Sequence, residues 1–265
     1  MKKQLKDLNL LDRFLFAQAI EDPATMKDML DIILGQDISL KSIQTEKESR
    51  KSPETRSVRL DVYAVDEDGA LYNTEVQKKN TYNIPNRSRL YQGMIDVNQL
   101  PAGTVDFNDL KDAYVILIAP FDLFGKGLYR YTFHMACDEV DGLKLNDGAT
   151  RIFLNTRGTN ADGVSQELIE LLHYMEHTTD EVSQVCTSNR IHQLNKRINE
   201  IKSNEEIGVK FVQAWEEKLY ERQAGIEIGE ERAKKVYKLF GAGKSPEEIA
   251  KECNLSLEKV KQILE

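Results

Sequence analysis

The chain has 265 residues, of which 40% are hydrophobic and 30% are charged, and its formal net charge at pH 7 is −8. This length allows one domain of ordinary size with an appendage, and the composition excludes an intrinsically disordered or a membrane-spanning chain. The acidic balance argues against general nucleic-acid binding, which is driven by lysine and arginine side chains that release counterions. A local basic cluster, as in residues 41–59, can still offset the net charge.

The cysteines Cys137, Cys186 and Cys253 are far apart and lack the spacing of metal ligands. This pattern fits a reducing compartment better than a secreted disulfide scaffold, and it predicts a cytoplasmic protein. The N-terminal sequence lacks an apolar run followed by a small-residue cleavage site. The longest apolar stretch, residues 114–120, is too short to cross a bilayer.

One helix, or two joined at Pro23, is predicted at the N-terminus, where apolar residues recur at helical spacing in residues 11–19 and 26–33. Pro23 breaks the pattern between them, and Gly35 is a typical helix stop. A first strand is then expected at residues 37–46, followed by a polar loop.

Residues 57–77 predict a β-hairpin with acid groups on one face. In residues 57–66 apolar side chains alternate with polar ones, so Asp61 points away from the apolar face. Residues 67–69 end in glycine and suit a three-residue hairpin loop. If the residues that flank this loop pair, Asp61 lies opposite Glu75, and Gln77 follows on the same face.

This arrangement suggests a metal site, because opposed side chains lie about 5 Å apart at Cβ and two ionised carboxylates would repel without a cation between them. Mg²⁺ prefers oxygen ligands, commonly one or two carboxylates together with substrate phosphate. Metal-dependent phosphodiester hydrolysis is therefore the first chemistry to consider. The alternative is a solvated polar face, since a D-x13-E-x-Q pattern taken alone is common by chance.

Further helices and strands complete the predicted domain. A helix at residues 83–100 carries Arg87 and Tyr91 four residues apart, so they share a face. Strands are expected in the ranges 113–120, 129–135 and 151–155, the first of them buried on both faces. This order predicts an α/β fold, a mixed β-sheet flanked by helices.

A rival metal chemistry is suggested by the helix at residues 164–177. It contains His173 and His177 in an H-x-x-E-H pattern, in which two histidines can hold zinc and the glutamate, Glu176, can act as a base. No third ligand can be identified, and a solvated helix end accounts for the same residues.

The remainder of the chain is expected to be helical. Residues 179–240 are predicted to form a charged helical arm with Trp215 on an apolar stripe. The stripe favours an arm that could pair with another copy into a homodimer over a cofactor site. In residues 241–265, Ser245 begins a capping box that opens the first of two short helices. Their spacing resembles a helix-turn-helix, although few basic residues lie on the second helix, so a docking or dimerisation module is the favoured interpretation.

Five sequence blocks resemble one known family. They are RLDVY from residue 59, YNTEVQ from 72, RSRLYQGMID from 87, GKGLYRYTF from 125 and IFLNTRG from 152. In order and spacing, from about residue 8 to residue 175, they resemble the PD-(D/E)XK nuclease family transposases, also called recombination-promoting nucleases. The resemblance implies a restriction-endonuclease-like domain at residues 1–178 and a metal-dependent DNA endonuclease.

The resemblance also implies roles for individual residues. Asp61 and Glu75 match the two metal-binding acids, for Mg²⁺ or Mn²⁺ in its place, and Gln77 falls where many relatives of the wider superfamily carry lysine. Glutamine cannot supply that positive charge. Asp12 matches an acidic position that can lend a carboxylate to the metal, and it equally suits a helix start.

The residues expected to contact DNA come from the same blocks. Arg87 would contact phosphate and Tyr91 would pack near the cleft, with Arg59 as a further contact. The biological setting implied is recombination, transposition or defence against mobile elements and phage. The alternative is a catalytically inactive DNA-binding or regulatory protein that retains the nuclease fold.

Overall fold

The computed structural model describes residues 4–49, 58–100 and 102–265, and of residues 45–49 and 58–62 it describes the backbone alone. The predicted polar loop at residues 47–56 therefore lies mostly outside the described residues. The elements in chain order are η1 (Leu5–Asp7), α1 (Arg13–Ile20), α2 (Pro23–Leu34), β1 (Leu40–Ser49), β2 (Val58–Asp66), β3 (Leu71–Val76), α3 (Ile84–Gln99), η2 (Phe107–Asp109), β4 (Ala113–Ala119), β5 (Arg130–Phe133), β6 (Ala149–Asn155), α4 (Gln166–Glu176), α5 (Asp180–Val185), α6 (Asn189–Ser203), α7 (Glu205–Gly241), α8 (Pro246–Cys253) and α9 (Leu257–Leu264).

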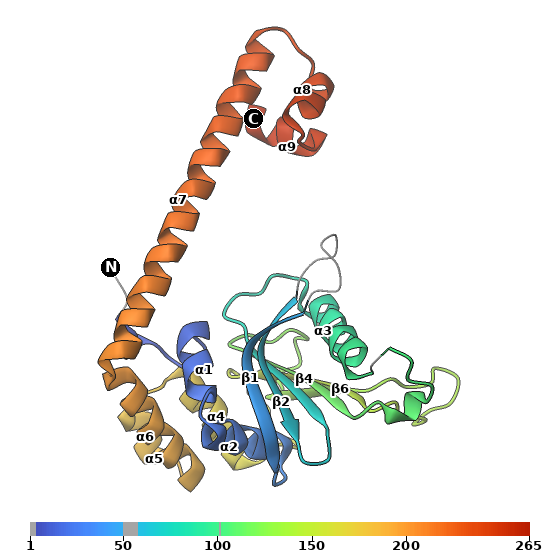
Figure 1. Ribbon diagram of the computed structural model, residues 1–265, viewed down its shortest axis with the longest axis vertical. Helices are drawn as coiled ribbons and strands as arrows, with labels where there is room; N and C mark the ends of the chain where they lie inside the picture. The colour runs from blue at the N-terminus through green and yellow to red at the C-terminus, as the bar shows by residue number, and fades with distance from the viewer. Residues whose placement is uncertain (1–3, 50–57, 101) are drawn as a thin grey trace. The chain divides into compact units, whose positions relative to one another are not determined.

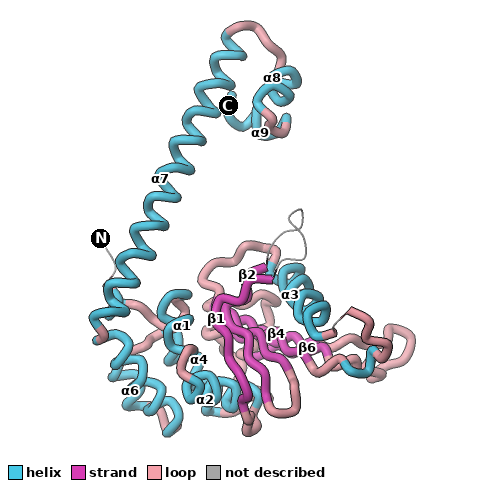
Figure 2. The backbone as a smooth tube through the Cα atoms, in the orientation of Figure 1, coloured by secondary structure: helices cyan, strands magenta, loops and turns pink. Residues whose placement is uncertain are grey.

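The described strands form one six-stranded mixed sheet in the order β1-β2-β3-β4-β6-β5. Strands β1, β2 and β3 pair antiparallel, β3, β4 and β6 pair parallel, and β5 returns antiparallel to β6. Helix α3 packs on β2 and β4, while α1 and α2 pack on the other side of the sheet with α4 beside them (Figures 1 and 2). This architecture confirms the predicted α/β class, with a helical C-terminal region.

Local signals explain the helix and hairpin boundaries. Asp22 caps α2 by accepting from the backbone N–H groups of its first turn, and Gly35 ends α2 in the left-handed conformation, at φ 70°. In the β2–β3 hairpin, the Asp66 N–H donates to the carbonyl of Ala70, and Gly69 has φ 87°. Both the two N-terminal helices and the hairpin loop are therefore as predicted.

One hydrophobic cluster lies between α3 and the sheet. Its buried members come from α3 and from strands β2 to β6, namely Tyr63, Leu71, Ile84, Tyr91, Ile95, Ala113, Val115, Leu117, Tyr131 and Phe153. Strand β4 is buried along nearly its whole length, as its continuous apolar sequence predicts. The core therefore reaches the C-terminal ends of β3 and β4, where the candidate site residues lie.

The chain divides into two compact units, Met1–Asn204 and Glu205–Glu265. The first unit extends past residue 178, where the predicted nuclease-like domain ends, because α5 contacts α4 and α6 contacts α1, α2 and α4. For example, Arg197 of α6 donates to the Thr25 hydroxyl of α2 at 2.9 Å and pairs with Asp28. Contacts between residues this distant in sequence are not visible in local patterns.

The second unit contains α7, α8 and α9. Val236 of α7, Ile249 of α8 and Val260 of α9 form a small buried cluster, so the end of the predicted arm and the predicted tail share one core. Ser245 and Glu248 make the expected reciprocal capping box at the start of α8. Within the described residues, none of the helices combines the length and the apolar character needed to span a membrane.

Candidate functional site

Glu75 lies near the C-terminal end of β3, between β2 and β4, and pairs in register with Leu117 of β4. The residue is only 2% exposed. The alternation in the hairpin puts Asp61, and with it Glu75, on the face away from the apolar one, which predicts that Glu75 stands outside the core. This expectation is wrong, because α3 packs over the sheet face that carries Glu75, and strand alternation alone does not reveal a covering helix. A buried carboxylate needs hydrogen-bonding or charged partners, which directs attention to the residues around it.

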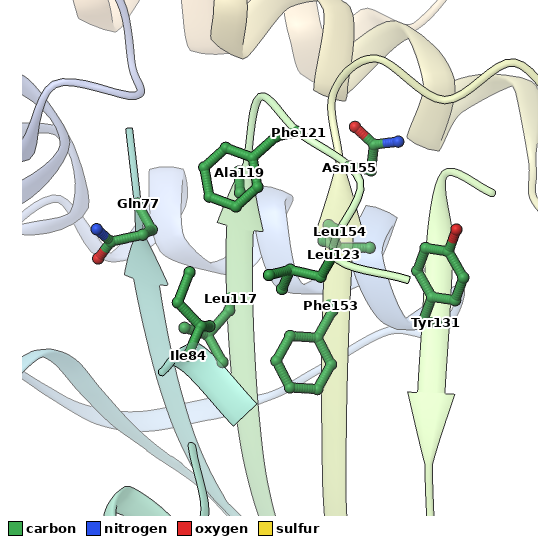
Figure 3. A pocket seen from close by; sticks show the side chains of 10 residues that line it. All are labelled: Gln77, Ile84, Leu117, Ala119, Phe121, Leu123, Tyr131, Phe153, Leu154 and Asn155. Atoms are coloured by element: carbon green, nitrogen blue, oxygen red, sulfur yellow. The ribbon is translucent and has the colours of Figure 1, made fainter. Parts of the chain in front are cut away.

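Gln77 directly follows β3 and is still held to the sheet, because its backbone N–H donates to the carbonyl of Ile118 at 2.8 Å. Its side-chain Nε2 donates to the carbonyl of Lys79 at 2.9 Å. Figure 3 shows Gln77 at the end of its strand, beside a small apolar hollow lined by Ile84, Leu117 and others. The Gln77 amide is therefore fixed in orientation at the rim of an apolar surface.

Arg87 of α3 contacts both site residues. Its Nη2 donates to Oε1 of Gln77 at 2.6 Å and lies 3.4 Å from Oε2 of Glu75. The guanidinium also lies over the Tyr91 ring, 5.5 Å from its centroid. The prediction that Arg87 and Tyr91 share a face is confirmed, and the structure adds that the positive charge of Arg87 bridges the Glu75 carboxylate and the Gln77 amide.

Asp12 is the N-cap of α1, where its Oδ1 accepts from the backbone N–H of Phe14 at 3.1 Å. Its Oδ2 lies 3.1 Å from Nζ of Lys78. The helix-start interpretation of Asp12 is confirmed. The ion pair brings Asp12 beside the residue that follows Gln77, and Lys78 is a neighbour that sequence reasoning missed, although it directly follows the E-x-Q pattern.

Asp61 and Arg59 lie in β2, and their side chains are outside the described part of the chain. The backbone register is described next to them: Val62 pairs with Thr74, and Val65 pairs with Leu71. This is the predicted register, and extending it by one residue sets Asp61 opposite Glu75. The convergence of their side chains stays a prediction.

The donors around Glu75 fit a hard divalent cation in their chemistry. Glu75 and Gln77 offer carboxylate and amide oxygens, and a cation, the guanidinium of Arg87, already lies between them. Asn73, two residues before Glu75 on the same strand face, is fully buried, and its amide has no hydrogen-bond partner among the described residues. No group of three metal-binding side chains occurs in the described residues, which exclude the Asp61 side chain.

The zinc alternative finds no such support at the end of α4. The rings of His173 and His177 lie 4.9 Å apart, but Glu176 accepts from the Thr156 hydroxyl at 2.5 Å and from Arg157 Nε at 2.7 Å. Burial would raise the pKa of Glu176, and these hydrogen bonds outweigh it and lower the pKa below its ordinary value. Glu176 is therefore an anionic anchor for the turn after β6.

Comparison with known proteins gives one match. The sequence fits the model of the family described as PD-(D/E)XK nuclease family transposase over residues 12–227. No curated protein and no solved structure matches the chain at a significant level. The matched segment contains Glu75, Gln77 and Arg87 and the whole six-stranded sheet, so the mixed sheet with flanking helices is the restriction-endonuclease-like α/β fold expected from the sequence.

Proposed function

Because the chain belongs to the PD-(D/E)XK nuclease family transposases, we propose that it is a metal-dependent endonuclease that hydrolyses phosphodiester bonds in DNA. The observation that carries the proposal is the buried Glu75 carboxylate at the end of β3, which lies with the Gln77 amide around a positive charge. A site that holds a cation between hard oxygen donors is the arrangement that such chemistry needs.

Asp61 and Glu75 would hold Mg²⁺, or Mn²⁺ in its place. When bound, such an ion supplies a Lewis acid that polarises phosphate oxygens and lowers the pKa of water. The Gln77 amide has two N–H donors and two carbonyl lone pairs. One N–H group donates to the Lys79 carbonyl, and one lone pair accepts from Arg87. Gln77 therefore keeps one N–H group and one lone pair with which to orient an attacking water.

The surrounding residues would bind and orient the DNA. Arg87 and Arg59 would contact phosphate, with Tyr91 packed against the Arg87 side chain. Asp12 would add a carboxylate at the end of β3, supported by its ion pair with Lys78. A cytoplasmic location, a role in recombination, transposition or mobile-element defence, and pairing of two copies through the C-terminal helices complete the proposal.

The direct test is plasmid cleavage by a Glu75→Gln variant. Glutamine keeps the volume of the buried side chain but removes its charge, so we expect a folded protein whose Mg²⁺-dependent nicking falls at least by the roughly 10–100-fold that loss of a metal-site partner costs. Supercoiled DNA would be incubated with wild type and variant, with Mg²⁺ and with a chelator. Glu67→Gln, an exposed acid in the hairpin loop, is the matched control and should cleave like wild type. Undiminished nicking by folded Glu75→Gln would refute the assignment.

A non-catalytic DNA-binding protein is the second candidate. The Arg87–Glu75 ion pair favours it, because an arginine already compensates the charge of the buried carboxylate. This alternative predicts a salt-sensitive gel shift with DNA that stays intact in Mg²⁺ and in Mn²⁺. Strand breaks that a chelator abolishes would exclude it.

A further inference from the structure

We propose, on the premise of the function above, that Arg87 is a movable counterion. Without metal it neutralises Glu75 and is held by Gln77. When a divalent cation takes the Glu75 carboxylate, the guanidinium is released toward the DNA and binds a phosphate oxygen. Arg87 would thus couple metal binding to substrate binding.

Glu75 is more deeply buried than Arg87, as release of the guanidinium requires. The Glu75 side chain is 3% exposed, whereas that of Arg87 is 27% exposed. The carboxylate is therefore held within the β-sheet, while the guanidinium is partly open to solvent. Of the two, Arg87 is the partner that can leave without opening the core.

The hydrogen bonding of the guanidinium is incomplete. Its shorter contact is with the neutral Gln77 amide, at 2.6 Å, and its distance to the Glu75 carboxylate is 3.4 Å. Its Nε is buried and has no hydrogen-bond partner within the described part of the chain. A buried donor without a partner on a charged group is unfavourable. The guanidinium would therefore leave this position for an anion that satisfies more of its N–H groups.

Electrostatics make the two cations competitors. Mg²⁺ binds oxygen at about 2.1 Å, and the guanidinium lies 3.4 Å from one Glu75 oxygen, so both cannot keep the same carboxylate without strong repulsion. A phosphate diester then offers the displaced guanidinium two anionic oxygens, which the planar guanidinium can bind through two parallel hydrogen bonds. Tyr91, beneath the guanidinium, gives it a surface along which to turn.

The test is isothermal titration of Mg²⁺ into the metal-free full-length wild type, Arg87→Gln and Arg89→Gln. Arg89 is exposed and lies on the same helix, so its substitution removes the same charge at another face. We expect Arg87→Gln to bind Mg²⁺ about fivefold or more tightly than wild type, because no counterion must be displaced, and Arg89→Gln to stay within about twofold of wild type. Arg87→Lys keeps the charge but lacks the planar guanidinium, and it serves as the second variant if Arg87→Gln fails to fold. Its affinity for Mg²⁺ should be higher than that of wild type and lower than that expected for Arg87→Gln.

A second readout separates this role from a structural one. Binding of a fluorescent DNA duplex would be measured with Ca²⁺ and with a chelator, with intact DNA verified on a gel. Arg87→Gln should weaken DNA binding several-fold with Ca²⁺ and little with chelator, because Arg87 reaches phosphate only after the exchange. Arg87→Gln affinity for Mg²⁺ equal to or below that of wild type, or equal losses of DNA affinity in both conditions, would overturn the exchange and leave the nuclease proposal intact. Absence of Mg²⁺ binding by wild type would instead overturn the nuclease proposal and the exchange with it.

Discussion

The Glu75 carboxylate is tolerated inside the protein because charged and polar groups are arranged around it. Removing one member of a buried ion pair leaves the charge of the other without compensation. This lowers the free energy of unfolding by more than the intact pair contributes to it. Arg87 and Glu75 are such a pair, although Arg87 also reaches solvent. Substitutions at this site must therefore preserve volume and polarity if loss of activity is to be distinguished from loss of folding.

Asp12 caps α1, and substitution can separate this role from the role proposed for it at the metal site. Asparagine caps a helix about as well as aspartate, whereas alanine at an N-cap costs about 0.5–2 kcal/mol. We expect Asp12→Asn to match wild type in its free energy of unfolding and Asp12→Ala to lose about 1 kcal/mol, as measured by urea denaturation. If the carboxylate also serves the metal site through its position beside Lys78, Asp12→Asn should cleave plasmid more slowly despite its normal stability. Full activity in both variants would restrict Asp12 to capping.

The identities of the site residues were accessible from the sequence, but their contacts were not. Glu75, Gln77 and Arg87 fall in sequence blocks that resemble the family, and the hairpin loop fixes the register of β3 against β2. The ion pair of Asp12 with Lys78 joins residues 66 positions apart, and the burial of Glu75 depends on how α3 packs over β3. Neither has a signature in local periodicity, because both are set by tertiary packing.

At the scale of elements, Glu170 joins α4 to the start of α6. Its carboxylate accepts from the backbone N–H groups of Thr187 and Ser188, at 2.8 and 3.2 Å, and from the Thr187 hydroxyl at 2.9 Å. Ser188 is the N-cap of α6, so one acidic side chain fixes the entry of that helix. Desolvation would raise the pKa of Glu170, but these hydrogen bonds outweigh it and lower the pKa below its ordinary value.

We therefore expect Glu170→Gln to destabilise the protein by about 1–3 kcal/mol at pH 7, because hydrogen bonds to a charged acceptor are lost or weakened. A lowered folded-state pKa means that the stabilisation is present above the unfolded pKa and is lost as the pH falls through the folded one. The difference between wild type and variant, measured by urea denaturation from pH 7 downwards, should thus shrink below about pH 4.5, the ordinary value for glutamate. Glu200→Gln, an exposed change on α6, is the control. A pH-independent difference would argue that packing, not charge, carries the effect.

Element types were more predictable than their assembly. The ends of α2 and the turn of the β2–β3 hairpin are set by capping residues and glycines that lie within a few positions of them in the sequence. The placement of α5 and α6 on the first unit depends instead on contacts such as that of Arg197 with Asp28, 169 positions away. The sequence pattern therefore identifies these helices but does not show that they pack against the first unit.

At the scale of the molecule, the family match and the compact units do not coincide. The match ends at residue 227, inside α7, whereas the second unit begins at Glu205. Helices α8 and α9 lie wholly outside the matched segment and are held to α7 by the cluster of Val236, Ile249 and Val260. The proposed nuclease site lies in the first unit, so its folding should not depend on this small cluster.

Ile249→Ala tests that independence. Loss of a fully buried isoleucine costs about 2–5 kcal/mol, which is comparable to all that a core this small can supply, so α8 and α9 should lose their packing. Hydrogen exchange followed by mass spectrometry should show faster exchange at residues 246–264 and unchanged protection in β3 and β4, with proposed Mg²⁺-dependent cleavage retained. Ile226→Ala, at an exposed position of α7, should leave both regions as in wild type. Reduced protection of β3 or β4 in Ile249→Ala would mean that the two units fold as one cooperative structure.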